Sequence, residues 1–177
     1  MILGKNIDLR PVEIKDAEFI LALRLDPELN QYISPVENDL EKQREWIKSH
    51  RLYSRDFYFI IQNKKQKPVG TIRVYDIKDS IFCWGSWIVV PGARRYASFE
   101  SAMLLYRFVF LGLGLHATNF DVRKENKRVV NFHSKLGATI FGETDLDYLM
   151  TYTKNTFLER QDEYKVVIDK LLQANEY

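Results

Sequence analysis

The sequence predicts an α+β domain built around one mixed, mostly antiparallel sheet. Three consecutive segments between residues 57 and 90 are rich in aromatic and β-branched residues, which is typical of antiparallel strands joined by short turns. Segments with helical spacing of apolar residues lie on either side of this region. The 177 residues fit one domain, with a core over 1–154 and a terminal helix over 155–177.

The first part of the chain predicts one strand and two helices. Residues 7–12 form a short strand that ends near Pro11. Residues 16–25 place Phe19, Ile20 and Leu23 at helical spacing, and the Asp-Pro pair that follows ends this helix. A second, highly charged helix is expected over 39–50.

The middle of the chain predicts three strands, over residues 57–62, 69–77 and 81–90. A lysine-rich turn joins the first two, and a second polar turn joins the last two. Gly85 lies inside the third strand, where a glycine suggests a β-bulge or a close approach of another backbone.

The second half alternates helices and strands. A helix is expected over 98–111, ended by Gly112 and Gly114, and a strand over 115–122. Asn126 caps a helix that runs to Leu136 and stops at Gly137. Two strands over 138–141 and 147–153 and an amphipathic helix over 155–175 complete the chain.

Composition narrows the class of protein. The formal charge of +2 gives no electrostatic argument for a nucleic-acid partner. The single cysteine, Cys83, excludes an intrachain disulfide and a cysteine-based zinc site, and no other metal-ligand pattern is present. No apolar segment has the length of a signal peptide core or a membrane span. We therefore expect a cytoplasmic protein with no membrane partner and no metal.

The first candidate site is the segment of residues 91–98, which leads from a strand into a helix. A helix start presents free N–H groups and the positive end of the helix dipole, so it favours anions. Arg94 and Arg95 add positive charge, and the small Ala97 and Ser98 allow a phosphate to approach the backbone. A diphosphate suits such a site, although an ordinary basic loop with a serine cap explains the same residues.

The second candidate site is His133 in the helix of residues 126–136. His133 shares one helical face with Val129 and Leu136, so its ring is expected to point inward. A half-buried histidine can exchange a proton near neutral pH, but a histidine with a purely structural role in the core fits the same pattern. His50 and His116 have no metal-type partners in the sequence and are interpreted as structural.

Together these features resemble the GNAT acetyltransferase superfamily, over nearly the whole chain. The resemblance rests on the order strand, proline, basic loop, helix and strand, followed by N-x-x-V-x-x-F-H-x-K-L-G-A from Asn126 to Ala138. The most similar branch includes RimJ/RimL-type and nucleotide-amino-sugar acetyltransferases. The resemblance implies that the middle strands of the sheet splay apart and that acetyl-CoA is the co-substrate.

The resemblance also assigns roles to residues. His133 stands where many members carry a tyrosine that protonates the departing thiolate. Ala97 and Phe99 stand where the family loop usually has glycine and a small residue, which predicts a reshaped loop or weaker pyrophosphate binding. The residues that the resemblance places along the cofactor are Ile88, Val89, Val90, Arg94, Arg95, Tyr96, Ala97, Ser98, Phe99, Asn126 and Phe132.

The expected reaction is direct transfer of the acetyl group to a small-molecule amine, without an acyl-enzyme. Tyr75, Trp84 and Trp87 are expected to line the acceptor cleft, and aromatic faces suit a nucleotide-linked amino sugar. Arg73 either serves a substrate phosphate or is an ordinary surface arginine. Four carboxylates remain open as the general base: Asp76, Asp79, Glu100 and Asp121.

Other functions stay open at this stage. One is acetylation of protein N-termini, as in RimJ/RimL-type enzymes. Another is a non-catalytic module that binds CoA or a protein. A homodimer through an exposed strand or the terminal helix is also possible.

Overall fold

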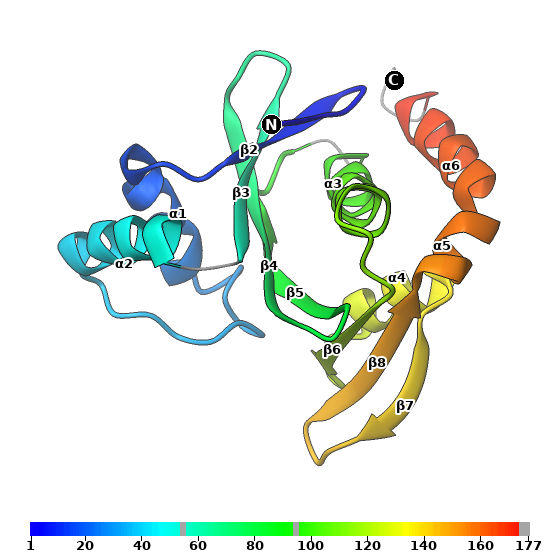
Figure 1. Cartoon of the computed structure of the whole chain (residues 1–177). Coiled ribbons are helices and arrows are strands. Elements are labelled where there is room, and N and C mark those ends of the chain that lie inside the picture. The colour runs from blue at the N-terminus through cyan, green and yellow to red at the C-terminus, as the bar shows by residue number, and fades with distance from the viewer. Residues whose placement is uncertain (54–55, 94–95, 174–177) are drawn as a thin grey trace.

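The computed structural model describes residues 1–53, 56–93 and 96–173 (Figure 1). Its strands are β1 (Ile2–Leu3), β2 (Ile7–Pro11), β3 (Phe57–Asn63), β4 (Pro68–Lys78), β5 (Ile81–Val89), β6 (Ala117–Arg123), β7 (Thr139–Glu143) and β8 (Asp147–Thr153). Its helices are η1 (Ile14–Asp16), α1 (Ala17–Leu25), α2 (Leu40–Tyr53), α3 (Tyr96–Arg107), η2 (Phe108–Gly112), α4 (Lys127–Leu136), α5 (Lys154–Glu159) and α6 (Gln161–Gln173). This is the α+β architecture that the sequence predicts.

The eight strands form one sheet in the order β1-β2-β3-β4-β5-β6-β8-β7. All neighbouring pairs are antiparallel except β5 and β6, which run parallel. That parallel pair is joined only at Ile81 with Ala117 and at Phe82 with Thr118. Beyond Phe82 the two strands part, while β5 continues to Val89 along β4. The splayed middle strands implied by the family resemblance are therefore confirmed.

Each face of the sheet is covered by different helices. A smaller cluster that includes Val12, Ile20, Ile47 and Ile60 joins α1 and α2 to one face. The larger cluster packs α3 against the opposite face, where Tyr106 is fully buried. In Figure 1 these two layers lie on opposite sides of β3 and β4. A molecule that enters between β5 and β6 thus meets a different set of side chains on each face.

A β-bulge in β5 confirms the expectation raised by Gly85. Thr71 pairs with Ile88 but Arg73 pairs with Gly85, so β5 carries one residue more than β4 across this interval. Ser86 takes the strained conformation, with φ of 47°, and its carbonyl accepts a 2.7 Å hydrogen bond from the Thr71 hydroxyl. Because of this extra residue, the side chains of β5 beyond the bulge point to the opposite face from the one that simple alternation predicts.

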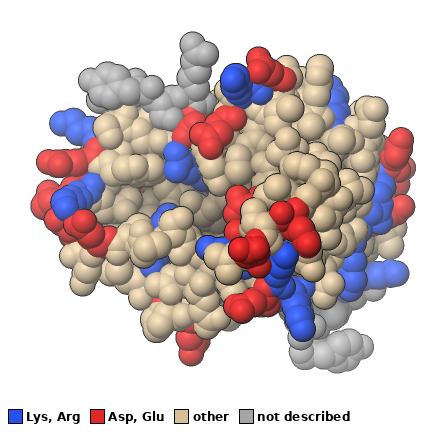
Figure 2. Space-filling view, turned by 90° about the horizontal axis from the view of Figure 1, so that it is seen from below, with Lys and Arg blue, Asp and Glu red and all other residues tan. Residues whose placement is uncertain are grey.

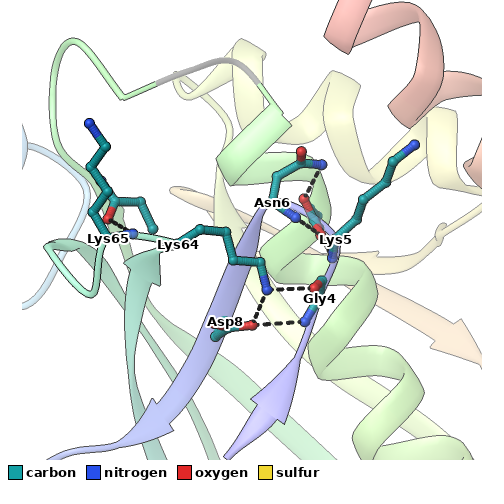
Figure 3. A network of polar contacts seen from close by, with 8 residues as sticks. Gly4, Lys5, Asn6, Asp8, Lys64 and Lys65 are labelled. Carbon is teal, nitrogen blue, oxygen red and sulfur yellow. Dashed lines mark hydrogen bonds and ion pairs between the residues drawn. The ribbon is translucent and has the colours of Figure 1, made fainter.

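The N-terminal turn is tied to α3 and to the β3–β4 turn (Figure 3). The Glu100 carboxylate accepts hydrogen bonds from the backbone amides of Lys5 and Asn6, at 2.6 and 3.0 Å. The Lys64 ammonium group donates to the Asp8 carboxylate, at 2.6 Å. Because these contacts join β1, β2 and α3, the N-terminus is part of the packed domain. The short strand β1 was not predicted, since two residues carry no periodic pattern.

Two helices differ from the expected ranges. α3 begins at Tyr96 and ends at Arg107, after which the π-helical turn η2 continues to Gly112. The predicted terminal helix is two helices, α5 and α6, with a break at Arg160. The Arg160 guanidinium donates to the Lys135 carbonyl, at 2.8 Å, and to Glu163. This contact turns the chain so that α6 packs against α3.

Candidate functional site

Because β5 and β6 part after Phe82, backbone N–H and C=O groups on the β6 side of β5 can hydrogen-bond a ligand there. Val90 donates its N–H to the Val69 carbonyl, at 2.9 Å, and so belongs to the β4–β5 ladder. Adjacent residues of a strand direct their hydrogen-bonding groups to opposite sides. Val89 therefore directs its N–H towards the side that β6 has left. Of the Val89 and Val90 amides, that of Val89 is therefore the one available to a ligand oxygen.

His133 lies in this region, where α4 packs beside the diverging strands. Asn126 begins α4 by accepting a hydrogen bond from the Val129 amide, at 3.2 Å, and Gly137 ends it with φ of 99°. The helix buries one face, as the sequence predicts, and leaves His133 only 3% exposed. Its ring centroid lies 4.5 Å from that of Phe120 and 5.3 Å from that of Trp84.

The aromatic surroundings keep His133 uncharged. Burial lowers the pKa of the imidazole from its ordinary value to about 3. Its Nδ1 atom is buried and has no hydrogen-bond partner among the described residues. A neutral imidazole carries one N–H donor and one acceptor nitrogen. The ring can therefore donate or accept a hydrogen bond without bringing a charge into the apolar site.

Trp84 and Trp87 belong to the same aromatic group as His133. The Trp84 ring packs against Tyr106 of α3, at 5.5 Å between centroids, and is 5% exposed. The Trp87 indole N–H donates to the Ser101 hydroxyl, at 3.1 Å, and its ring lies 5.0 Å from Phe132. Both tryptophans thus lie on the α3 face of the sheet, although three positions separate them. The bulge at Ser86 accounts for this shared facing.

Tyr75, the third residue expected to line the acceptor cleft, lies on the other face. It pairs with Cys83 across β4 and β5. The Arg73 guanidinium carbon lies 5.0 Å from the Tyr75 ring and 5.1 Å from the ring of Trp46 in α2. The structure therefore separates Tyr75 from the two tryptophans. It groups Tyr75 instead with Arg73 and Trp46, and the contribution of Trp46 was not foreseen.

The start of α3 lies next to a pocket with a volume of about 350 Å³. Ala97 is 2% exposed, and Phe99 packs 6.3 Å from Phe132 between ring centroids. Ile88 is also buried, while Val89, Tyr96 and Ser98 are half-buried. Arg94 and Arg95 lie outside the described residues. The pocket brings together Val90, Tyr96 and Ala97 of the predicted cofactor set with Ile7, Asn63, Lys67, Val69, Pro91, Gly92 and Ala93.

The four carboxylates considered as a general base differ in their availability. Asp76 is exposed on β4, which pairs with the edge of β5 opposite the gap. Glu100 is 2% exposed and holds the N-terminal turn, so both its oxygens are occupied. Asp79 is in the β4–β5 turn, away from the parted strands. Asp121 lies on β6 between the buried Phe120 and Val122, so it faces away from α3. Among these groups Asp121 is on the strand that borders the gap.

One face of the molecule is concave. Figure 2 shows a hollow in the face seen from below, with Lys and Arg side chains along it and Asp and Glu side chains gathered beside it. Within the described ranges, no group of three or more His, Cys, Asp or Glu side chains is arranged to hold a metal ion. In the same part of the chain, no helix is both long and apolar enough to cross a membrane.

Known proteins are similar to this chain in sequence and fold. Residues 6–139 match the acetyltransferase (GNAT) domain family. The SPbeta prophage-derived uncharacterized N-acetyltransferase YokL of Bacillus subtilis (strain 168) is 27% identical over 138 residues, which cover 76% of each chain. The solved structure of apo FdhC, a nucleotide-linked sugar GNAT, is 39% identical, has a TM-score of 0.81, and covers 90% of this chain and 93% of its own.

A more distant structure shares the fold alone. Spermidine N-acetyltransferase from Vibrio cholerae, solved in complex with CoA and spermine, is 18% identical. Its TM-score is 0.77, and the match covers 86% of this chain and 98% of that one. The family match and the 39% identical structure establish the relationship. The present chain belongs to the acetyltransferase (GNAT) domain family and is an acyltransferase.

Proposed function

We propose that this protein transfers the acetyl group of acetyl-CoA to the amine of a nucleotide-linked amino sugar. The observation that carries the choice of acceptor is the 39% identity, over 90% of the chain, to a nucleotide-linked sugar GNAT. The parted strands β5 and β6 support the use of a thioester donor, because the free edge of β5 can hydrogen-bond an extended ligand. In this proposal the acceptor reaches the thioester from the opposite face of the sheet to His133 and α3.

The donor lies along β5 in this proposal. Its carbonyl oxygen accepts a hydrogen bond from Val89, whose N–H is directed towards the gap. A fixed backbone donor at this point stabilises the negative charge that develops on the oxygen during the reaction. The diphosphate of the cofactor lies by the start of α3, near Tyr96 and Ala97, where the helix dipole favours an anion.

The reaction is a direct transfer. The uncharged amine of the acceptor attacks the thioester carbonyl carbon, so that a C–N bond forms and the C–S bond breaks. The amine loses one proton, which Asp121 or a water molecule receives, and the departing thiolate gains one proton from solvent or from a nearby donor. Holding both reactants in one site supplies much of the acceleration, because the step no longer depends on a chance encounter.

His133 assists the leaving group in the proposed mechanism. With a pKa of about 3, its ring is neutral and donates an N–H hydrogen bond to the sulfur as negative charge develops there. The variant His133→Phe keeps a ring of similar size but removes the donor. We expect turnover to fall about tenfold while the affinity for acetyl-CoA, measured by calorimetry, stays unchanged. Unchanged turnover would reject the role.

Thiol release from acetyl-CoA tests the choice of acceptor. The rates are compared for UDP- and dTDP-linked amino sugars, the same free amino sugars, and peptides with free N-termini. We expect kcat/KM to be at least about 100-fold higher for a nucleotide-linked sugar than for its free sugar. A peptide as the best acceptor would favour the RimJ/RimL-type reaction instead. Calorimetric binding of acetyl-CoA with no thiol release for any amine would favour a non-catalytic CoA-binding module.

A further inference from the structure

Three buried nitrogen atoms on the α2 face of the sheet have no hydrogen-bond partner among the described residues. They are Nε of Arg24, Nε of Arg73 and Nε2 of His50. Buried polar atoms in proteins nearly always have a partner, so such a group calls for one supplied from outside. Two of these nitrogens belong to guanidinium groups, which only donate. Among the described residues, these two guanidinium nitrogens thus lack an acceptor.

Arg73 is held in one orientation. Its guanidinium carbon lies 5.1 Å from the Trp46 ring and 5.0 Å from the Tyr75 ring, so an aromatic side chain contacts it from α2 and another from β4. Its Nη2 atom donates to the Asp56 carboxylate. The Arg73 side chain is 24% exposed, which leaves part of the guanidinium open to solvent. A planar fork held in this way is suited to phosphate oxygens.

Arg24 approaches the same place from the last turn of α1. One of its Nη atoms donates to the Ser34 carbonyl, at 2.7 Å, in the segment that joins α1 to α2. Tyr58 lies within the electrostatic reach of both arginines. Burial raises the pKa of its phenol, and the charges of Arg24 and Arg73 oppose that rise. We call Arg24, Arg73, Trp46 and Tyr58 the arginine pair site.

The charge balance of this site favours an anion. Among the described residues, the Arg24 and Arg73 guanidinium groups both act on Tyr58, and the Asp56 carboxylate bonds Arg73. His50 adds no positive charge, because burial and then the Arg73 charge lower the pKa of its imidazole. Like charges at low effective dielectric repel one another, and a bound anion relieves that repulsion.

Arg73 of the arginine pair site lies on β4, the strand that pairs with β5. Arg73 pairs with Gly85 on β5, and Tyr75 pairs with Cys83, the first residue of β5 after the strands part. β4 is about 4.8 Å from β5, whose other edge borders the gap, and four residues, about 13 Å along the strand, separate Gly85 from Val89. An acceptor that spans this interval presents an anionic group to the arginines and its amine to the thioester.

We propose that Arg24 and Arg73 bind the diphosphate of the acceptor and that the exposed part of the Trp46 side chain contacts the nucleotide. Trp46 is 38% exposed; His50 stacks on its ring, at 4.8 Å between centroids, and the Arg73 guanidinium lies over it, so the exposed part of the indole is beside this guanidinium. The proposal rests on the proposed function and specifies how the acceptor is recognised. Diphosphate is preferred over a carboxylate because two arginines from different elements converge on the site, which suits several oxygens.

Calorimetry with UDP and dTDP as probes tests the site directly. The protein is first saturated with CoA, so that the region near the start of α3 is already occupied. We expect one of the two nucleotides to bind, and we expect Arg73→Met to weaken this binding at least about 20-fold. Arg73→Lys keeps the charge but loses the planar fork, and it should weaken binding about fivefold to tenfold. Each variant should bind CoA as the wild type does.

Arg44→Met is the matched control. Arg44 is another arginine of α2, but it pairs with Glu41 at the surface and should leave nucleotide affinity unchanged. Thermal melting of each variant checks that it folds. If Arg73→Met has a lower melting temperature than the wild type, the comparison rests on Arg73→Lys. Equal nucleotide affinity in the wild type and Arg73→Lys would overturn the arginine pair site. The site would also be overturned if the wild type binds CoA and acetylates an amine that carries no phosphate, but binds neither nucleotide. Failure to bind CoA would instead contradict the proposed function.

Discussion

The side chains that border the gap between β5 and β6 differ in the electrostatic work they can do. His133 is enclosed by aromatic rings and is neutral, since burial lowers its pKa to about 3. Asp121 is exposed on β6, and its negative charge adds to the effect of burial in raising the pKa values of Tyr75 and Cys83. The buried, uncharged His133 imidazole and the exposed Asp121 carboxylate thus lie on opposite faces of the sheet.

The position of Asp121 predicts a role in deprotonating the acceptor. Asp121→Asn removes the negative charge and the proton acceptor, so kcat/KM should fall by about 100-fold near neutral pH. The defect should shrink at high pH, where hydroxide receives the proton that the attacking amine loses. Rates of thiol release between pH 6 and 9 measure this. Asp79→Asn, in the β4–β5 turn, is the matched control and should retain wild-type rates. Equal pH profiles for both variants would exclude the role.

The low pKa of His133 predicts a loss of stability in mild acid. The folded-state pKa, about 3, is below the unfolded value of about 6.5, so protonation favours the unfolded chain. The stabilising effect of the neutral ring is complete above pH 6.5 and declines as the pH falls towards 3. At pH 5 the loss is about 2 kcal/mol.

Urea unfolding at pH 7 and pH 5 measures this loss. In His133→Phe, the decrease in the free energy of unfolding between the two pH values should be smaller than in the wild type by about that amount. Some decrease remains, because the pKa of His50 is also lowered by burial. The same decrease in both proteins would show that His133 is protonated at pH 5 in the folded state, and so that burial does not lower its pKa in this way.

At the scale of the elements, α4 is positioned by its two ends. Asn126 caps the first turn, and Gly137 takes a left-handed conformation, with φ of 99°, that closes the last. The Tyr164 hydroxyl donates to the Leu136 carbonyl, at 3.0 Å, so α6 also holds this end of the helix. His133 lies one turn before the closure, and its carbonyl accepts from the Ala138 amide, at 3.0 Å. The end of α4 therefore sets where the imidazole lies.

A pair of glycine variants separates backbone strain from lost space at this end. A methyl group on Gly137 would meet Thr156 Cγ2 at 2.8 Å, whereas one on Gly114, with φ of 73°, would meet nothing within 4 Å. Gly114→Ala should cost about 1 kcal/mol for its backbone conformation alone. Gly137→Ala should cost about 1 to 3 kcal/mol more, because packed neighbours must shift.

Urea unfolding at neutral pH measures both variants. Equal losses in the free energy of unfolding would show that α5 yields easily and that α4 is not fixed by this contact.

At the scale of the whole molecule, most elements follow from local patterns. Alternation and helical spacing predict β2 to β8 and the main helices, because each buries one face and so repeats with its own period. Those patterns do not reveal that β5 and β6 part after Phe82, since both strands have ordinary sequences. That property was implied only by the family resemblance. The break at Arg160 depends on Lys135, which is distant in the sequence, and it too leaves no local signal.

The candidate site was only partly predictable for a related reason. His133 was expected to point inward, which helical periodicity is enough to predict. The shared facing of Trp84 and Trp87 depends on the bulge at Ser86, and simple alternation would place them on opposite faces. The arginine pair site joins α1, α2, β3 and β4 through contacts between distant residues. A single sequence contains no signal for such a group.

The central claim is that donor and acceptor meet in one complex, from opposite faces of the parted strands. Initial rates measured while acetyl-CoA and the best nucleotide-linked amino sugar are both varied test it most directly. Double-reciprocal plots should give intersecting lines, because both substrates must be bound before the C–S bond breaks. Parallel lines would contradict the account, since they would show that the acetyl group first passes to the enzyme and that CoA leaves before the acceptor reacts.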